Sequence, residues 1–400
     1  MKSKEDYIKG LSKVKLIIGN GFDLHCHMKT SYKDFFLHDE KKNELCKILI
    51  DKFNIFMKDY WEYNSSTFIH NCDIFDDIVI NNIWDFFFYL NSNNNNNNLN
   101  QKEWRWCDIE DTMLKWLMDR EKNQIDSGKP YWERVYNIIN NNVTSDDIKL
   151  CFLATAIYIK HNRKRFDNIN DFYIFLLGEL KVFEMNFGSY IDGLHFDRTN
   201  ESFGVILPKT SFRHYSAITI KELCNFNNLS SIDSFNYDSL ENADFDSKLI
   251  NINGNHEAPI FGIDSDAFPA SDIRYIFSKT NRRMELDMLN DEERKNEPYE
   301  NVVIYGHSLN KADYSYFFAV FDKLQISDLT NNSKIIFAFS IYDDAKEQKI
   351  RSEFRSAVSK MFYDYSIYLG KEKQPNRLLD VLTSQGKILM YEISEISTLY

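Results

Sequence analysis

The chain has 400 residues, of which 43% are hydrophobic, 27% are charged and 15% are aromatic. This composition excludes a chain that is disordered throughout, because it supplies ample apolar material for a buried core. With 13 glycines and 6 prolines, the composition also excludes a fibrous protein. The length allows one large domain with an insertion, or two to three ordinary domains.

The charge balance bears on the partners of the protein. Lys and Arg total 48 against 60 Asp and Glu, which gives a net charge of -12. Phosphate neutralisation supplies most of the affinity of a dedicated DNA-binding protein, so nucleic acid is not an expected partner. Six cysteines form no C-x-x-C pair, which is typical of reduced thiols. We find no targeting segment and no apolar run of membrane-spanning length, and therefore expect a cytoplasmic protein without a membrane partner.

A buried strand is predicted at residues 14–18, directly before Gly19-Asn20-Gly21. A helical pattern begins after Ser31, a residue suited to an N-cap. Strand, glycine turn and helix in this order are typical of the start of a nucleotide-binding α/β sheet. We therefore assign residues 1–40 to the first βα unit of an α/β nucleotide-binding domain.

Residues 41–228 are predicted to form a large helical insertion. Helical spacing of apolar residues marks four segments, at 45–61, 104–122, 146–159 and 172–191. An asparagine-rich run at 91–98 predicts an exposed loop. We expect the insertion to regulate the protein, through homo-oligomer formation or a partner protein that contacts its aromatic surface.

The remainder of the α/β domain is predicted at residues 229–400. Short β-rich runs occur at 229–235, 249–253, 301–305, 334–342 and 388–393. Helical patterns at 311–324 and 344–361 separate several of these runs. Because strands that alternate with helices indicate a mostly parallel sheet, the expected fold is a doubly wound α/β domain split by the helical insertion.

Short polar motifs follow several of the predicted strands, at the edge where an open parallel sheet binds its ligand. Gly19 and Gly21 would let the backbone pass close to a phosphate, or would form a tight turn only. Asn236 and Asp238 end another strand, and there an amide can hold a ribose hydroxyl or a water. The alternative for this pair is an ordinary Asx turn.

His256 and the turn at 306–308 are the other polar motifs that follow predicted strands. His256 is a candidate general base near neutral pH, although a loop histidine is more often an ordinary surface residue. The turn is not a nucleophile elbow, because G-x-S-x-G requires glycine where Asn310 stands and no histidine follows His307. A Gly-x-Ser turn after a strand instead suits a nucleotide ribose or phosphate.

The other polar motifs predict neither a metal site nor a phosphate loop. The His-Cys-His run at 25–27 matches no zinc spacing, and no G-x-x-x-x-G-K-[ST] sequence occurs. Basic runs at 160–165 and 279–283 are expected to lie on solvated faces.

Taken together, several motifs resemble one family. The stretch at 16–35, L-I-I-G-N-G-F-D-L-H-C-H-M-K-T-S-Y-K-D-F, resembles the opening of the AbiH family of phage abortive-infection proteins. The resemblance continues at 235–240, 261–264 and 305–314, and residues 106–114 are similar to the family's tryptophan-plus-acidic helix. It implies a role in antiphage defence, with a phage-derived trigger as a partner.

A remoter similarity, to sirtuin-like NAD-binding domains, implies a Rossmann-like fold and roles for single residues. It implies that Asn236 positions ribose hydroxyls or the attacking water, with Asp238 supporting it. Asn253 replaces the histidine that serves as general base in that pattern, which leaves His256 or His307 for this role. We assign catalysis to Asn236, Asp238 and His256, and NAD binding to Gly19, Asn20, Gly21, Asp23, Gly306, His307, Ser308 and Asp313.

The expected function is hydrolysis of NAD, as a substrate, to nicotinamide and ADP-ribose during abortive infection, with no metal. Two alternatives stay open. One is a nucleotide-binding sensor that signals without catalysis, which Asn253 favours. The other is an RNA-targeting nuclease that uses the basic runs and the acidic helix around Glu110, which the net charge of -12 weakens.

Overall fold

A computed structural model describes residues 4–38, 40–59, 72–75, 77–85, 87–88, 107–118, 154–155, 157–158, 166, 169–196, 209–240, 245, 248–289, 297–341 and 343–393. The chain forms two compact units. The first, called the sheet unit, comprises Met1–Thr30, Phe187–Ile260 and Lys279–Tyr400. The second, called the helical unit, comprises Ser31–Asn186 and Phe261–Ser278. The domain boundaries expected after residues 40 and 228 stay predictions.

Six parallel strands form the centre of the sheet unit. They are β1 (Val14–Ile18), β2 (Leu229–Ser234), β3 (Leu249–Asn251), β4 (Asn301–Tyr305), β5 (Lys334–Ser340) and β6 (Ile388–Ile393). Their order in the sheet is β3-β2-β1-β4-β5-β6, and every neighbouring pair is parallel. This is the strand order of dinucleotide-binding Rossmann folds. The predicted doubly wound α/β fold is confirmed.

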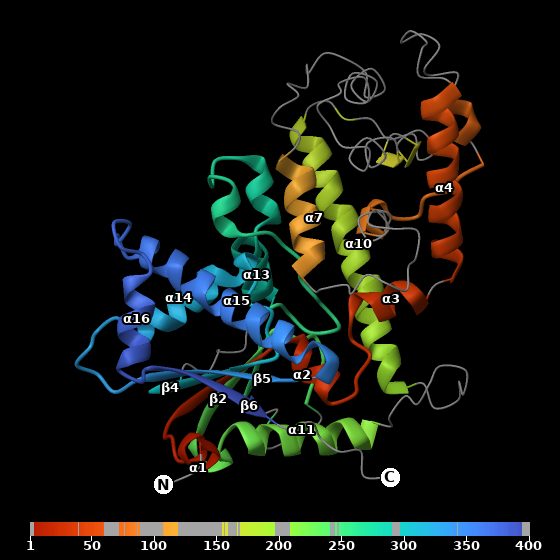
Figure 1. The fold of residues 1–400 in the computed structure, drawn as a ribbon. Helices are drawn as coiled ribbons and strands as arrows, with labels where there is room; N and C mark the ends of the chain where they lie inside the picture. Colours follow the sequence, from red (N-terminus) through yellow and green to blue (C-terminus); the bar gives the residue numbers. More distant parts are fainter. Residues whose placement is uncertain are drawn as a thin grey trace. The chain divides into compact units, whose positions relative to one another are not determined.

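Helices cover both faces of the sheet (Figure 1). Leu16 and Ile18 of β1 point to one face, and Ile17 points to the other, because side chains alternate along a strand. The first face packs against α1 (Lys4–Lys9), α2 (Asn20–His25) and α11 (Lys209–Leu223). The opposite face packs against α14 (Tyr314–Lys323), α15 (Glu347–Tyr368) and α16 (Arg377–Ser384).

The predicted helices match the structure in part. The helix expected at 311–324 is α14 preceded by a short 3₁₀ turn, and the helix expected at 344–361 extends to Tyr368 as α15. Helix α2 was not predicted: it begins within the glycine turn, where Gly19 is its N-cap. The helix expected after Ser31 is α3, which is part of the helical unit.

Glycines allow the loop after β1 to lie directly against the loop after β4. Gly19 N donates to the oxygen of Tyr305 at 3.0 Å, and Gly21 N donates to the oxygen of Gly306 at 2.8 Å. Gly306 has a φ of +71°, and a Cβ built on it would lie 2.3 Å from the nitrogen of Phe22. These glycines therefore allow the loops after β1 and β4 to touch. The contact lies at the point in the sheet where the order of strand addition changes direction.

This contact gives a first prediction. Gly306→Ala should lower the free energy of unfolding by about 2 kcal/mol more than Gly370→Ala, measured by urea denaturation. Gly370 is a matched control because its φ is +72° but no atom lies within 4 Å of the added Cβ. Equal losses for the two variants would contradict the close approach of the loops.

Aromatic side chains dominate the core of the helical unit. Its elements are α3 (Tyr32–His38), α4 (Glu40–Asp59), α7 (Cys107–Met118) and the part of α10 (Ile169–Phe196) that precedes Phe187. Trp84 packs edge-on against Trp116, at 5.5 Å between ring centroids, and its Nε1 donates to the oxygen of Leu176 at 2.8 Å. The helical character predicted here is confirmed for α4, α7 and α10. The run at 91–98, the run at 160–165 and most of the helix expected at 146–159 lie outside the described residues.

Candidate functional site

Two clusters of buried polar side chains lie at the carboxyl ends of the strands in the sheet unit. We call them the Asp23 cluster and the Asp313 cluster. The Asp23 cluster comprises Asn20, Asp23, Thr30, Asn236 and Asp238. The Asp313 cluster comprises Asn253, Lys279, Arg283, His307 and Asp313. This edge of the sheet is where open α/β folds bind their ligands.

Hydrogen bonds fix the side chain of Asn236 within the Asp23 cluster. Its Nδ2 donates to Asp23 Oδ1 at 2.6 Å and to the oxygen of Gly19 at 3.1 Å. The carbonyl oxygen of Gly19 can only accept, so the amide nitrogen must face it. Asn236 Oδ1 makes no hydrogen bond to any described residue. It is therefore the atom that this side chain can offer to a ribose hydroxyl or a water.

The end of β3 holds the loop that carries Asn236. Asn251 Nδ2 lies 3.0 Å from the oxygen of Asn236 and 3.3 Å from the oxygen of Asp238. Ser234 Oγ accepts from the backbone nitrogen of Asn236 at 3.1 Å. The loop after β2 is thus tied to its neighbour at several points, which places Asn236 and Asp238 on a rigid support.

Asp23 is an acid whose proton is held unusually tightly. Burial raises its pKa well above the ordinary range, and the charge of Asp238 raises it further. Hydrogen bonds from Thr30 and Asn236 oppose this shift without cancelling it. Two interacting carboxyl groups, one of which has a raised pKa, are an arrangement that suits general acid–base chemistry.

The raised pKa makes stability depend on pH. The folded protein favours protonated Asp23, so stability is highest below the unfolded pKa of about 4 and falls as pH rises through the folded pKa. Asparagine mimics the protonated acid, so Asp23→Asn should stabilise the protein more at pH 8 than at pH 5. Urea denaturation of the two proteins at both pH values measures this gain.

The exposed Asp266 provides a control for the exchange of Asp for Asn itself. If the stabilisation by Asp23→Asn does not increase from pH 5 to pH 8 by more than the corresponding change for Asp266→Asn, the pKa of Asp23 is not raised.

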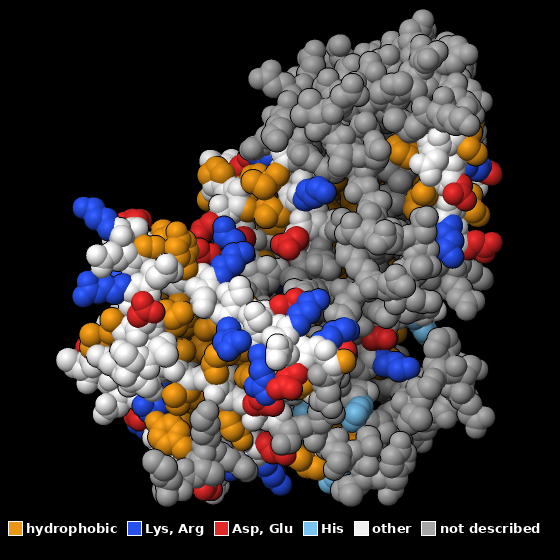
Figure 2. All heavy atoms as spheres, viewed as in Figure 1, with side chains coloured by type: hydrophobic (Ala, Val, Ile, Leu, Met, Phe, Trp, Pro, Cys, Tyr) orange, Lys and Arg blue, Asp and Glu red, His pale blue; other side chains and the backbone are white. Residues whose placement is uncertain are grey.

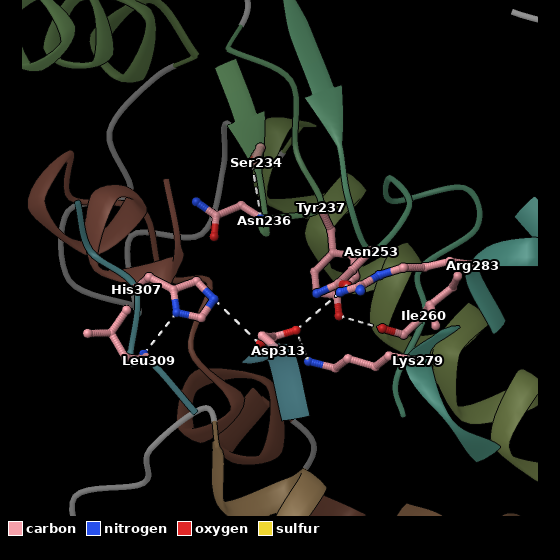
Figure 3. Close-up of polar contacts among 10 residues, drawn as sticks. All are labelled: Ser234, Asn236, Tyr237, Asn253, Ile260, Lys279, Arg283, His307, Leu309 and Asp313. Carbon is pink, nitrogen blue, oxygen red and sulfur yellow. Dashed lines mark hydrogen bonds and ion pairs between the residues drawn. The ribbon is translucent and has the colours of Figure 1, made fainter. Parts of the chain in front are cut away.

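One carboxylate organises the Asp313 cluster (Figure 3). Asp313 Oδ1 lies 2.7 Å from Lys279 Nζ and 3.2 Å from an Arg283 nitrogen, and its Oδ2 lies 3.5 Å from His307 Nε2. The same Arg283 nitrogen, Nη2, donates to Asn253 Oδ1 at 2.9 Å. Burial alone would raise the pKa of Asp313, but the charges of Lys279 and Arg283 and the hydrogen bond from His307 hold it below the ordinary range.

Both ring nitrogens of His307 are occupied. Nδ1 accepts a hydrogen bond from the backbone nitrogen of Leu309 at 2.9 Å, so the ring proton is on Nε2 and faces Asp313. The ring also packs edge-on against Phe235, with 4.4 Å between centroids. His307 therefore orients its neighbours, and it has no nitrogen left to take a proton from a substrate.

Comparison with protein-family models identifies one family. The model described as "Bacteriophage abortive infection AbiH" matches residues 16–334. The chain belongs to the AbiH family. The matched segment of this AbiH protein contains both clusters, whereas α15, α16 and β6 lie beyond it. No curated protein and no solved structure matches the chain. The similarity to sirtuin-like domains stays a prediction.

The structure groups some of the expected site residues of this AbiH protein and separates others. Gly19, Asn20, Asp23 and Asn236 are joined by hydrogen bonds, directly or through Thr30. His307 contacts Asp313, while Ser308 is exposed. His256 Nε2 lies 3.8 Å from Asp192 of α10, and no described contact joins His256 to Asn236. The proposed roles of these residues stay predictions.

Other contributors were not predicted from the sequence. The basic run at 279–283 was expected on a solvated face; that expectation is wrong, because Lys279 and Arg282 are buried in the first turn of α13 (Lys279–Leu289). No sequence motif marked Thr30 or Asn251 as a site residue. Thr30 is a polar residue after a helix, and Asn251 is a polar residue at a strand end. Asn253 was noted only as a replacement for histidine, and the structure gives it a partner in Arg283.

The residues that the structure describes contain neither a metal-ligand cluster nor a membrane-spanning helix. No group of three or more His, Cys, Asp or Glu side chains is placed to hold a metal ion. Among the helices that the structure describes, none has both the length and the apolar composition needed to cross a membrane.

Proposed function

We propose that this AbiH-family protein acts in phage abortive infection by hydrolysing NAD to nicotinamide and ADP-ribose. The single observation that carries the proposal is the Asp23 cluster. It places an amide oxygen and two interacting carboxyl groups at the switch point of a sheet with the strand order of dinucleotide-binding folds.

The chemistry of these groups suits the cleavage of a nicotinamide–ribose bond. Nicotinamide leaves with the electron pair of the C–N bond as a neutral molecule, so its departure needs no general acid. The ribose then carries positive charge, which a carboxylate at the Asp23 and Asp238 pair would stabilise. Water adds to C1′ and gives its proton to the same pair, and Asn236 Oδ1 would orient the water or a ribose hydroxyl.

Product analysis tests the proposal. The full-length protein is incubated with labelled NAD in extract from phage-infected cells, so that any trigger is present. We expect the wild-type protein to release nicotinamide and ADP-ribose in equal amounts, and Asp238→Asn to release neither, because protonation of Asp23 leaves Asp238 to carry the negative charge of the pair. The variant keeps the shape of the side chain, so it separates loss of chemistry from loss of fold. Intact NAD in the wild-type reaction would contradict hydrolysis.

A nucleotide sensor that signals without catalysis is the second candidate. The engagement of both His307 nitrogens and the presence of Asn253 favour it, because neither residue can act as a general base. In the same extract, NAD that binds the wild-type protein but stays intact would favour the sensor.

The RNA-targeting alternative receives less support. Glu110, its expected acid, is 4% exposed in the helical unit. On the face in Figure 2, positive and negative side chains are mixed. In the sheet unit, Arg351 of α15 pairs with Glu347 of the same helix and with Glu392 of β6. A single broad basic area would be expected of a surface that tracks RNA.

A further inference from the structure

Strand β6 is an edge strand of the sheet in the part of the chain that the structure describes. It pairs with β5 along its whole length, beginning with Ile388 opposite Ile335, and the pairing contains no bulge. An edge strand presents backbone N–H and C=O groups to which a further strand can bind, and proteins usually protect it with proline, charge or a bulge. The run at 388–391, I-L-M-Y, contains neither proline nor charge. This part of β6 is therefore suited to strand pairing.

The pairing with β5 fixes which backbone groups of β6 point away from the sheet. Ile335 N donates to the oxygen of Lys387 at 2.8 Å, so the backbone groups of Lys387 face β5. Successive residues of a strand direct their N–H and C=O groups to opposite sides. The groups of Leu389 therefore also face β5, whereas those of Ile388 and Met390 point outward. A further strand can bind there without breaking any bond between β5 and β6.

A groove with a volume of about 820 Å³ follows this edge. Residues 388–391 of β6 line it, together with side chains from helices on both faces of the sheet. Ile8 of α1 comes from one face, and Val358 of α15 and Leu379 of α16 come from the other. An extended chain in this groove would pair with β6, and its side chains would alternate between the two faces.

The charge of the groove favours an acidic occupant. Among the described residues that line it, the charged side chains are those of Lys334 and Arg355, which are both cations. They lie on opposite faces of the sheet: Lys334 Nζ is 5.9 Å from the ring centroid of Tyr7 in α1, whereas Arg355 is an exposed residue of α15. An extended chain with acidic side chains on both of its sides would bring a carboxylate to each cation.

We propose that the edge of β6 docks an extended acidic segment of a partner protein, which adds to the sheet as a further strand. A second copy of this chain is less suited, because its own β6 would bring Lys334 and Arg355 to the same edge, and like charges repel. The groove begins at the amino ends of β5 and β6, whereas both polar clusters lie at the carboxyl ends of the strands. The proposed docking therefore does not depend on NAD hydrolysis.

Fluorescence anisotropy of a labelled synthetic peptide tests the proposal on the full-length protein. The probe, Val-Glu-Glu-Val-Val-Glu-Glu-Val, carries acidic side chains on both sides when it is extended. We expect it to bind at least about tenfold more tightly than the same peptide with Lys in place of Glu, and to bind less tightly as salt is added. Equal binding of the two peptides, or binding of neither, would overturn the proposal.

Two substitutions locate the binding at this edge. Met390→Pro removes an outward N–H, a change that an edge strand tolerates, and should weaken binding of the acidic peptide at least about tenfold. Met390→Val keeps the N–H and should keep the affinity. Arg355→Gln leaves the strand unchanged and should weaken binding about threefold. Lys360→Gln, at an exposed position of α15 that does not line the groove, should leave binding unchanged.

Arg355→Gln keeps the proposal testable if Met390→Pro does not fold. If the wild-type protein and the variants bind the acidic peptide equally, the segment does not dock at β6 and the proposal is wrong. Light scattering tests the second copy. A wild-type dimer that Met390→Pro converts to a monomer would overturn the acidic partner in favour of self-association through β6.

Discussion

Asp313→Asn should lower the free energy of unfolding by about 3–5 kcal/mol at pH 7, which is the usual cost of removing one partner from a buried ion pair. Asparagine preserves the shape of the side chain but leaves the fully buried ammonium of Lys279, 2.7 Å away, without its counterion. Arg283 loses the same partner. Urea denaturation of the two proteins measures the difference.

The difference in the free energy of unfolding between the wild-type protein and Asp313→Asn should disappear in acid. The pKa of Asp313 is lowered in the folded protein, so its contribution is present above the unfolded value of about 4 and is lost as pH falls through the folded value. The exposed pair of Lys13 and Glu300 is the control, and Glu300→Gln should leave the denaturation midpoint unchanged. A similarly small effect for Asp313→Asn would mean that the cluster does not compensate Lys279.

Asn236→Ala should lower kcat/KM for NAD by about 10²–10³-fold, the usual loss when a preorganised polar group at a reacting centre is removed. The substitution removes Oδ1, which is available to a ligand, and also the amide that donates to Asp23. Loss of that hydrogen bond should raise the pKa of Asp23 further, since the bond lowers it in the wild-type protein. The rate of nicotinamide release at several pH values measures both effects.

A matched control uses an asparagine that faces solvent. Asn227→Ala, in the 3₁₀ turn before β2, should hydrolyse NAD at the wild-type rate. If Asn236→Ala and Asn227→Ala were equally active, Asn236 would have no part in the reaction. If both were inactive, the loss would come from the fold of the β2 region and not from the amide of Asn236.

The fold could be predicted because its central strands are short, mostly apolar runs. Val14–Ile18 and Asn301–Tyr305 are buried on both faces, as strands in the middle of a parallel sheet must be. The positions of Asn236 and Asp23 also followed from the sequence, since parallel strands place their carboxyl ends at one edge. Helix α2 was missed because a glycine pair at a strand end indicates a turn as readily as a helix start.

The Asp313 cluster depends on partners that are distant in sequence. A run of basic residues is usually solvated, and only the fold brings Lys279 to Asp313, 34 positions away. The tautomer of His307 depends on a hydrogen bond from the backbone nitrogen of Leu309, and no sequence motif describes this contact. The glycines at 19, 21 and 306 were expected to approach a phosphate or ribose or to form a tight turn; the structure adds that they bring two loops of the protein together, a contact between segments far apart in sequence.

The level of NAD in cells during phage infection tests the central claim most directly. Bacteria that express the wild-type protein, Asn236→Ala or Asn227→Ala are infected, and NAD and nicotinamide are measured over time together with survival of the culture. We predict that NAD falls and nicotinamide rises in wild-type and Asn227→Ala cells, and that NAD stays constant in Asn236→Ala cells, which also lose protection. Constant NAD in cells that the wild-type protein nevertheless protects would contradict NAD hydrolysis as its mode of action.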